Sequence, residues 1–322
     1  MSFSHTGKKG GIPLASLGAV QRVKQSEQSA AENWSKAQRQ TDRVMRWLFA
    51  GSAVLVSAVI FSIMLFVGIQ GMQTFQGVSP LTFFFSTDWA PADGRFGAFP
   101  FLFSTFALTL LAIALSVPVA VSGAVFMAKI APKWMREILR PATDLFVGIP
   151  SVVYGLIGLT VLVPYLAKLT GETGYGLLPA AVILAIMILP TILSISEDAI
   201  RSLPRSLEEA SLALGATRWQ TIWRVLLPAA RPGILTGVIL GMGRAIGETM
   251  AVFMVIGNAP QMPKSLLDST TVLTTAIVKD MPNTFYGTTW NHALYLMALL
   301  LLLISMFLIL VIRVVARRRE LK

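Results

Sequence analysis

Two charged residues, Arg244 and Glu248, stand four positions apart inside the apolar stretch GMGRAIGETMAVFMVIG, residues 241–257. An ionised side chain near the centre of a bilayer costs at least about 2.5 kcal/mol. The planar guanidinium group of arginine presents several N–H donors that suit the oxygens of phosphate. We therefore expect Arg244 to attract and orient an anion, while Glu248 weakens that attraction so that the anion can leave.

The same pair also has a purely structural interpretation. Residues four apart on a helix are neighbours, so Arg244 and Glu248 could form a salt bridge without touching a substrate. An unpaired charge at this depth is costly, and apolar residues would serve packing without that risk. A carboxylate at position 248 could also accept a hydrogen bond from protonated phosphate, which ionised sulfate does not offer. This last role is a hypothesis, and uptake by a Glu248→Gln variant tests it.

Hydroxyl groups in two apolar stretches extend the candidate anion path. Ser151 and Tyr154 follow Pro150 in FVGIPSVVYG, and Thr249 follows Glu248. Since proline cannot donate a backbone hydrogen bond, we expect Pro150 to kink a membrane helix at this point. A kinked helix that only packs against its neighbours explains Ser151 and Tyr154 equally well.

Three glycines precede the charged pair at intervals of four residues, Gly233, Gly237 and Gly241. At about 100° per residue, they share one narrow helical stripe with Arg244 and Glu248. Glycines at this spacing let two helices approach closely. We therefore predict helix packing along the stripe, with the charges facing protein or water and not lipid.

These residues must be positioned by membrane-spanning helices. The chain of 322 residues is 54% hydrophobic and 13% charged, whereas soluble domains are about 25% charged. A span needs roughly 17–25 apolar residues, and six stretches satisfy this. They are residues 48–69, 101–127, 145–166, 177–196, 233–257 and 293–312. The sequence predicts an all-α integral membrane protein, with a tail over 1–46, a permease domain over 47–316 and a basic C-terminal tail over 317–322.

The basic residues are distributed very unevenly between the two sides of these spans. Of the 27 Lys and Arg residues, 22 fall in residues 1–46, in the loops 128–144 and 197–232, and in residues 313–322 after the last span. Four fall in the other loops, and Arg244 lies in a span. By the positive-inside rule, both termini are cytoplasmic. The formal net charge of +11 is thus a topology signal and does not indicate nucleic-acid binding.

Composition excludes several other chemistries. There are no cysteines, so disulfides and cysteine-ligated metals are excluded, and the two histidines do not suggest a metal site. We find no G-x-x-x-x-G-K-[ST] pattern that would cradle nucleotide phosphates. If ATP drives this protein, another chain must bind it.

The cytoplasmic loop over residues 199–230 is predicted to form two short helices. Ser206 could cap the first helix, with Glu208 and Glu209 in its first turn. Gly215 suits a left-handed C-cap, and Pro228 marks the start of the next span. An interfacial helix on lipid headgroups and a docking element for a cytoplasmic partner explain the pattern equally well.

The spacing of this loop resembles the permease subunits of ABC importers. Their pattern is EAA, three residues, Gly, nine residues, then I-x-L-P. Here Glu209-Ala210-Ser211 is followed at the same spacing by Gly215 and by Val225-x-Leu227-Pro228. Ser211 and Val225 are mild departures. In that family the loop forms a coupling helix that docks in a groove of an ATPase subunit. The resemblance implies the same contact with an ATPase for Glu208 and for the residues that match the pattern.

The stretches VGIPSVVYGLIG, AIMILPTI and GRAIGETMAV are similar to PstC-type permease subunits of phosphate importers, and GETMAV favours these over the PstA type. This resemblance implies the type I (MetI-like) importer fold in the bacterial inner membrane. It also implies a PstA-like partner permease, two ATPase copies that bind ATP and Mg²⁺, and a periplasmic phosphate-binding protein. The resemblance associates Arg244 and Glu248 with transport. A permease for sulfate or molybdate and an ion-driven secondary transporter are the alternatives.

Overall fold

A computed structural model describes the backbone of residues 14–320 and the side chains of residues 41–310 and Val314. The chain separates into two compact units, residues 1–65 and 66–322. Six helical segments are long and apolar enough to cross a membrane, which confirms the predicted number of spans. These segments are Thr41–Gln76, Phe99–Ile130, Ser151–Thr170, Leu177–Arg201, Arg218–Gly247 and Thr289–Leu310.

The first helix differs from the predicted tail followed by a span. Helix α1 runs without interruption over Leu14–Met72 and continues into the 3-10 turn η1 (Gln73–Gln76). The predicted boundary at residue 46 therefore does not coincide with the end of an element. The first part of the predicted tail, residues 1–13, lies outside the described residues.

The second unit contains the other spans. Its helices are α2 (Pro80–Phe85), α3 (Phe99–Val125), α4 (Lys133–Gly148), α5 (Ser151–Ile157), α6 (Val163–Thr170), α7 (Leu177–Arg201), α8 (Arg205–Ala213), α9 (Arg218–Thr221), α10 (Leu227–Gly247), α11 (Met250–Val255), α12 (Leu273–Asp280) and α13 (Thr289–Glu320). The π-helical turns η3 (Phe126–Ile130), η4 (Gly158–Leu162) and η5 (Ile222–Leu226) extend or join some of these. The short 3-10 turns are η2 (Pro91–Asp93) and η6 (Met281–Asn283).

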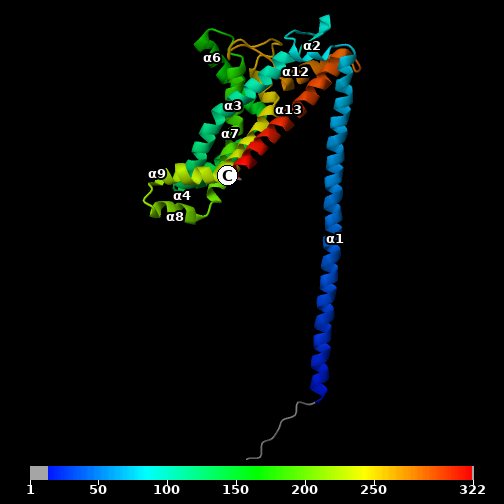
Figure 1. Ribbon diagram of the computed structural model, residues 1–322, viewed down its shortest axis with the longest axis vertical. Helices are drawn as coiled ribbons and strands as arrows, with labels where there is room; N and C mark the ends of the chain where they lie inside the picture. Colours follow the sequence, from blue (N-terminus) through cyan, green and yellow to red (C-terminus); the bar gives the residue numbers. More distant parts are fainter. Residues whose placement is uncertain (1–13, 321–322) are drawn as a thin grey trace, which may run out of the picture. The chain divides into compact units, whose positions relative to one another are not determined.

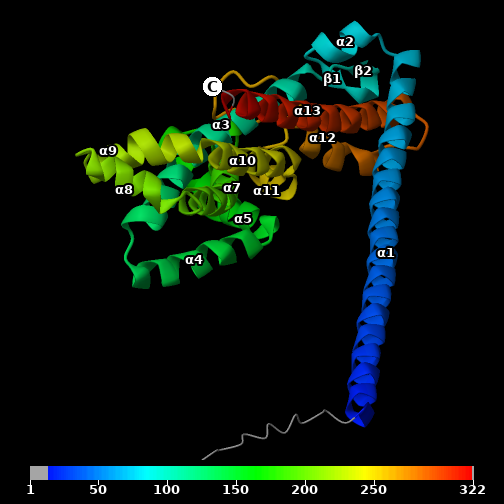
Figure 2. The same cartoon turned by 60° about the horizontal axis from the view of Figure 1, so that its bottom comes forward.

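Helix α7 forms the centre of the second unit. It packs against α3 on one side and α10 on another, and α10 in turn packs against α13 (Figures 1 and 2). Leu184, Met187, Ile188 and Ile192 of α7 are fully buried. An apolar helix that is covered on several sides must sit inside a bundle, so the other spans are arranged around α7.

The third span begins later than predicted, and Pro150 does not kink it internally. Helix α4 ends at Gly148, and α5 starts at Ser151 after Pro150, which occupies the N-cap position. Proline pushes the preceding residue out of the helical region, and Ile149 has an extended conformation with ψ 128°. Pro150 therefore separates two helices.

The aromatic stretch before α3 forms a small core at the end of the bundle opposite α8. Strands β1 (Trp89–Ala90) and β2 (Arg95–Phe96) pair beside α2 (Figure 2). Phe83, Trp89, Phe96 and Phe101 are buried, with edge-to-face ring contacts among them. The indole Nε1 of Trp89 donates to a carboxylate oxygen of Asp280 at 3.0 Å. These buried rings pack together and stabilise a folded cap. Rings of an aromatic belt at the bilayer surface would not form such a core.

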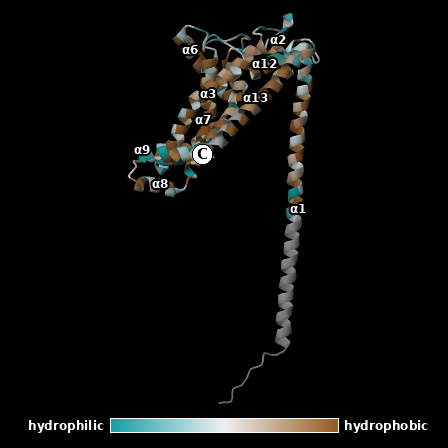
Figure 3. Ribbon diagram, in the orientation of Figure 1, coloured by the Kyte–Doolittle hydropathy of each residue, from teal (hydrophilic) through white to brown (hydrophobic). Residues whose placement is uncertain are grey.

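The two ends of the second unit carry different elements. Helices α4, α8 and α9 lie at one end, and α2, α6 and α12 lie at the other (Figure 1). Brown, hydrophobic residues cover α3, α7 and α13, whereas α8 and α9 mix teal and brown (Figure 3). The loops that the charge distribution predicts to be cytoplasmic are thus together at one end.

Candidate functional site: the broken fifth span and the coupling loop

The fifth span is not one helix through residue 257, which corrects the sequence prediction. Helix α10 ends at Gly247, because Glu248 has an extended backbone with ψ 130°, and α11 starts at Met250. The hydroxyl of Thr274 in α12 donates to the backbone carbonyl of Glu248 at 3.1 Å. A break inside a membrane-spanning segment needs such a partner for the carbonyl that helical bonding leaves free.

This break separates Arg244 from Glu248. Arg244 lies in the last turn of α10, where the helix dipole favours a positive charge. Carboxylate Oε1 of Glu248 instead accepts a long hydrogen bond of 3.4 Å from the backbone of Ala251 in α11. Within the described residues, no ion pair joins Arg244 to Glu248. The structural interpretation of the pair, a salt bridge between Arg244 and Glu248, is therefore not found in the described residues.

The glycine stripe lies against α7 of the same chain. A Cβ atom added to Gly241 would be 2.7 Å from Cγ1 of Ile192, and one added to Gly237 would be 3.2 Å from the carbonyl oxygen of Ile192. At Gly233, the added atom would meet the Cβ of Ala199. The absence of side chains at these three positions lets α10 approach α7 closely.

Tyr154 is the most fully buried of the candidate hydroxyl residues. Its side chain is buried, with 5% exposed, and its hydroxyl donates to the backbone carbonyl of Phe146 at 2.8 Å. Arg244 is close enough for its charge to act on this hydroxyl group. A Cβ atom at the next residue, Gly155, would be 2.9 Å from Cα of Ala251. Helix α5 therefore packs tightly against α11, just beyond the break.

The other predicted path residues are less closely connected. Ser151 and Thr249 are half-buried, and the hydroxyl of Thr249 donates to the carbonyl of Gly247 at 3.3 Å. In the described part of the chain, no hydrogen bond joins Ser151 to Arg244 or Glu248. The structure thus places Glu248 and Thr249 at the break, where the carbonyl of Glu248 contacts α12.

The coupling loop folds as two helices around Gly215. Gly215 has φ +82°, in the left-handed region that glycine adopts without strain. Pro204 occupies the N-cap position of α8, so Ser206 lies inside the helix and does not cap it, contrary to the sequence prediction. Thr217 and Gln220 form a capping box at the start of α9. The hydroxyls of Ser211 and Thr221 pair at 2.9 Å across the turn.

The second half of the loop leads into the fifth span without a break. Helix α9, the turn η5 and α10 are continuous from Arg218 to Gly247, and Pro228 lies in the first turn of α10. Proline removes one backbone donor and crowds the preceding turn, which the wider π turn before it accommodates. The second half of the loop and the fifth span therefore form one continuous helix, and Arg244 lies in the last turn of that helix.

Two pairs in this region were not predicted from the sequence. Lys129 of η3 lies 2.6 Å from Glu208 of α8. The rings of Trp219 and Trp223 stack at 5.9 Å between centroids, and each residue is 62% exposed. The four-residue spacing of the tryptophans is a usable signal. Lys129 and Glu208 are 79 positions apart, and no local pattern connects them.

The described residues contain no cluster of three or more His, Cys, Asp or Glu that could hold a metal ion. The groups available for binding are a guanidinium, a carboxylate, hydroxyls and exposed apolar side chains. This set suits passage of an anion and docking of a partner.

The chain matches the family described as "Binding-protein-dependent transport system inner membrane component" over residues 120–321. This match covers more than half of the chain, and the chain belongs to that family. It is a multi-pass inner membrane protein and a component of a transport system.

Individual relatives narrow the comparison. The chain is 48% identical over 292 residues to "Probable ABC transporter permease protein YqgH" of Bacillus subtilis, covering 89% of this chain and 94% of the relative. It is 35% identical over 319 residues to "Phosphate transport system permease protein PstC" of Mesorhizobium japonicum, covering 92% and 96%.

Solved structures share the fold. A bacterial alginate ABC transporter in complex with an alginate pentasaccharide-bound periplasmic protein aligns with a TM-score of 0.59 at 18% identity, covering 84% of this chain and 94% of that one. An inward-facing MetNI methionine ABC transporter aligns with a TM-score of 0.51 at 21% identity, covering 68% and 94%. The predicted MetI-like permease fold is confirmed.

Proposed function

We propose that this chain is the permease subunit of an ATP-driven importer and forms, with a second permease, the path for inorganic phosphate across the inner membrane. The observation that carries the proposal is the 35% identity to proteins named phosphate transport system permease protein PstC, over 82–92% of this chain. The fold and the coupling loop support the ATP-driven part. Arg244 beside Tyr154 supports an anionic substrate.

The exposed side chains of the coupling loop support docking to an ATPase subunit. Leu214 is 90% exposed at the turn between α8 and α9, next to Gly215, and the stacked Trp219 and Trp223 are also exposed. Large apolar side chains that gather on a surface mark interaction sites. Glu209 and Ala210 lie exposed on α8, and they complete a surface of mixed polarity that suits a groove.

The proposed assembly contains several chains besides this one. Two copies of an ATPase would bind ATP and Mg²⁺, a PstA-like permease would form the other wall of the path, and a periplasmic protein would deliver phosphate. This chain would bind no cofactor of its own. In this assembly, the chain is a transport component, and hydrolysis takes place on the ATPase copies.

The continuous helix from Arg218 to Gly247 gives a route from ATP hydrolysis to the anion path. Movement of an ATPase against α8 and α9 would move this helix as a rigid element, since the π turn keeps it unbroken at Pro228. Its glycine face stays against α7. The displacement reaches Arg244 in the last turn, immediately before the break at Glu248, where α10 and α11 can change their relative angle.

In this mechanism Arg244 binds phosphate oxygens and Glu248 tunes that binding. An arginine in a low-dielectric environment binds a phosphate group strongly, which favours capture over release. The carboxylate of Glu248 has only one long hydrogen bond, so it retains acceptor capacity for a protonated phosphate oxygen. The buried Tyr154 keeps α5 in place beside both.

The alternatives fit the chain less well. A sulfate or molybdate permease would share the coupling loop, but relatives 33–35% identical to this chain are named phosphate transport system permease proteins. An ion-driven secondary transporter would not need the coupling loop. The similarity to ABC permeases therefore does not favour it.

Phosphate uptake by the reconstituted importer, with sulfate as competitor, tests the proposal. Arg244→Gln is expected to lower uptake at least about tenfold, because a charge-assisted hydrogen bond contributes roughly 1.5–3 kcal/mol. Glu248→Gln is expected to retain assembly and to change both uptake and discrimination against sulfate. Lys264→Gln, at an exposed position, serves as the control for loss of one charge.

Each result bears on a different part of the proposal. Normal uptake by both variants at normal membrane levels would remove Arg244 and Glu248 from the anion path. Stronger competition by sulfate than by unlabelled phosphate would reject phosphate as the substrate. Uptake that persists without an ATPase would reject the ATP-driven mechanism.

A further inference from the structure

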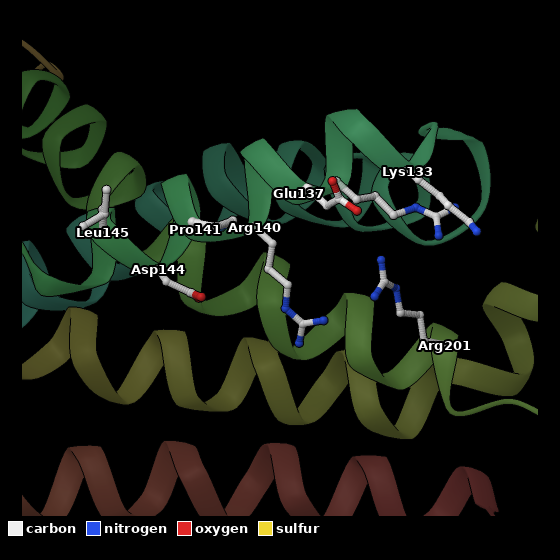
Figure 4. Close-up of a pocket in the computed structure, with 8 residues that line it drawn as sticks. Lys133, Glu137, Arg140, Pro141, Asp144, Leu145 and Arg201 are labelled. Atoms are coloured by element: carbon white, nitrogen blue, oxygen red, sulfur yellow. The ribbon is translucent and has the colours of Figure 1, made fainter.

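A cavity of about 770 Å³ lies between α4 and the end of α7. Figure 4 shows Arg140 on α4 and Arg201 on α7 pointing toward the same space, with Lys133 at one end of it. Arg136 of α4 also lines the cavity. These four positive side chains come from the loops that the charge distribution places on the cytoplasmic side.

The residues that line the cavity are more basic than acidic, but two of the basic ones are paired with acids of α7, Asp198 and Glu197. Glu137 and Asp144 are the acidic residues among those that line it, against four basic ones. The lining residues of α4 recur at three- and four-residue intervals, so they share one face of the helix. On this face Lys133 and Arg136 form no ion pair within the described part of the chain, and positive charges at a concave surface attract anions.

The two arginines that face each other are held in position by acids of α7. Arg140 lies 3.1 Å from Asp198, and Arg201 lies 2.7 Å from Glu197, whose side chain is 2% exposed. The contact to Glu197 is poorly aligned, since its Oε1 atom makes no hydrogen bond in the described part of the chain. Both guanidinium groups therefore keep N–H donors directed away from their acid partners.

Arg136 is the residue that points most clearly to a missing ligand. Its Nε atom is buried and has no hydrogen-bond partner among the described residues. Neither Arg136 nor Lys133 forms an ion pair within the described part of the chain. The buried Nε atom does not reach the open space, so an anion in the cavity would be bound by the other N–H groups of the Arg136 guanidinium.

Apolar residues lie beside the basic ones. Pro141 and Leu145 line the cavity. Leu145, Trp134 and Ile138 are 73%, 61% and 62% exposed, on the adjacent side of α4. A helix with one basic face, one exposed apolar face and a tryptophan near its start is typical of the membrane surface, where phosphate groups of lipids are abundant.

We propose that the cavity between α4 and α7 is a second anion site that binds a phosphate group on the cytoplasmic side, separate from Arg244. The phosphate group belongs either to an anionic phospholipid or to free orthophosphate, since both offer the same oxygens to Lys133, Arg136, Arg140 and Arg201. Basic pockets between helices on this side of a membrane are suited to anionic headgroups. This site does not depend on which anion the importer carries.

The site adjoins the coupling loop. A second hollow shares Arg136 and Arg201 with the first, and Glu208 and Glu209 of α8 line it as well. A phosphate group bound to Arg136 and Arg201 would neutralise their positive charge. The two arginines would then attract the carboxylates of Glu208 and Glu209 less strongly. Occupancy of the site would therefore change the position or mobility of α8, where the ATPase is proposed to dock.

The test measures phosphate-group binding by the whole importer in nanodiscs, with Arg244→Gln present in every sample so that the proposed path does not contribute. The first arm counts phosphatidylglycerol molecules that remain bound in native mass spectrometry, in phosphatidylcholine discs with and without phosphatidylglycerol. The second arm measures radiolabelled orthophosphate binding by equilibrium dialysis in pure phosphatidylcholine discs.

Both arms compare Arg136→Gln with Arg231→Gln, an exposed arginine at the start of α10 that does not line either hollow. Arg136→Gln is expected to weaken binding about tenfold, and Arg136→Lys to retain part of it. Lys133→Gln, at an exposed position, gives a second variant that cannot disturb folding through burial.

Weakening in the lipid arm identifies an anionic phospholipid as the ligand, and weakening in the dialysis arm identifies free orthophosphate. If Arg136→Gln and Lys133→Gln both match Arg231→Gln in both arms, the site does not exist. Co-purification of the ATPase with each variant shows that the importer is assembled. Because transport is not measured, this outcome is independent of the proposed phosphate import.

Discussion

The ammonium group of Lys129 lies 2.6 Å from a carboxylate oxygen of Glu208, joining the end of the second span to the coupling loop. Lys129 is 19% exposed and Glu208 is 38% exposed in their side chains. A half-buried pair of this kind contributes about 1 kcal/mol or less to stability. Its location matters more than its energy, because it fixes α8 against the end of the second span, outside the continuous helix from Arg218 to Gly247.

We therefore predict that Lys129→Gln changes coupling more than folding. Thermal unfolding of the importer should shift little, whereas phosphate uptake per ATP hydrolysed should fall several-fold. The exchanged pair Lys129→Glu with Glu208→Lys should restore part of the loss. If the exchanged pair is no better than either single variant, the ion pair does not position α8.

Gly241 should be intolerant of any side chain. An alanine Cβ would be 2.7 Å and 2.9 Å from two atoms of Ile192, which is fully buried and has no room to move. Gly241→Ala is expected to destabilise the protein by about 1–3 kcal/mol. Gly243→Ala is the matched control on the same helix, because its nearest neighbour is Ile309 at 3.9 Å. Equal unfolding temperatures for the two variants would contradict close packing of α10 on α7.

Gly215 should be sensitive to its backbone conformation and not to space. Its φ is +82°, and an added Cβ would have no neighbour within 4 Å. Gly215→Ala is expected to weaken the coupling loop by about 1 kcal/mol, and Gly215→Asn by less, because asparagine tolerates the left-handed region. Hydrogen exchange of the α8 and α9 amides measures the effect. Faster exchange with Asn than with Ala would overturn it.

Leu214 should contribute to ATPase docking and not to folding. The residue is 90% exposed, so Leu214→Asp is expected to leave the unfolding temperature unchanged. It should weaken ATPase binding at least about tenfold, as expected for the loss of a central apolar contact. Phe285→Asp, 84% exposed at the opposite end of the bundle, is the control. Equal ATPase binding by both variants would place the docking surface elsewhere.

Local sequence was sufficient for the spans and for the turn of the coupling loop. The second span was predicted over 101–127 and is helical over Phe99–Ile130, and the fourth was predicted over 177–196 and is helical over Leu177–Arg201. Hydropathy is a sum over neighbouring residues, so it can be read from a window. Gly215 was predicted for the same reason, since its left-handed backbone depends on its own lack of a Cβ atom.

Hydropathy did not predict where the helices are interrupted. The stretch from Arg244 to Ile256 is apolar throughout apart from Glu248, Thr249 and Arg244 itself, yet α10 ends at Gly247. The break exists because Thr274 supplies a hydrogen bond to Glu248 from 26 positions away. A partner this distant leaves no mark in a window of local sequence.

The sequence alone predicted the number of spans and the two-helix loop around Gly215, because each follows from the chemistry or spacing of neighbours in the chain. Only the tertiary structure decided that α10 ends at Gly247 between Arg244 and Glu248, that the glycines face α7, and that Lys129 pairs with Glu208. These arrangements depend on packing and hydrogen bonding between helices, which the order of residues specifies only through the folded whole.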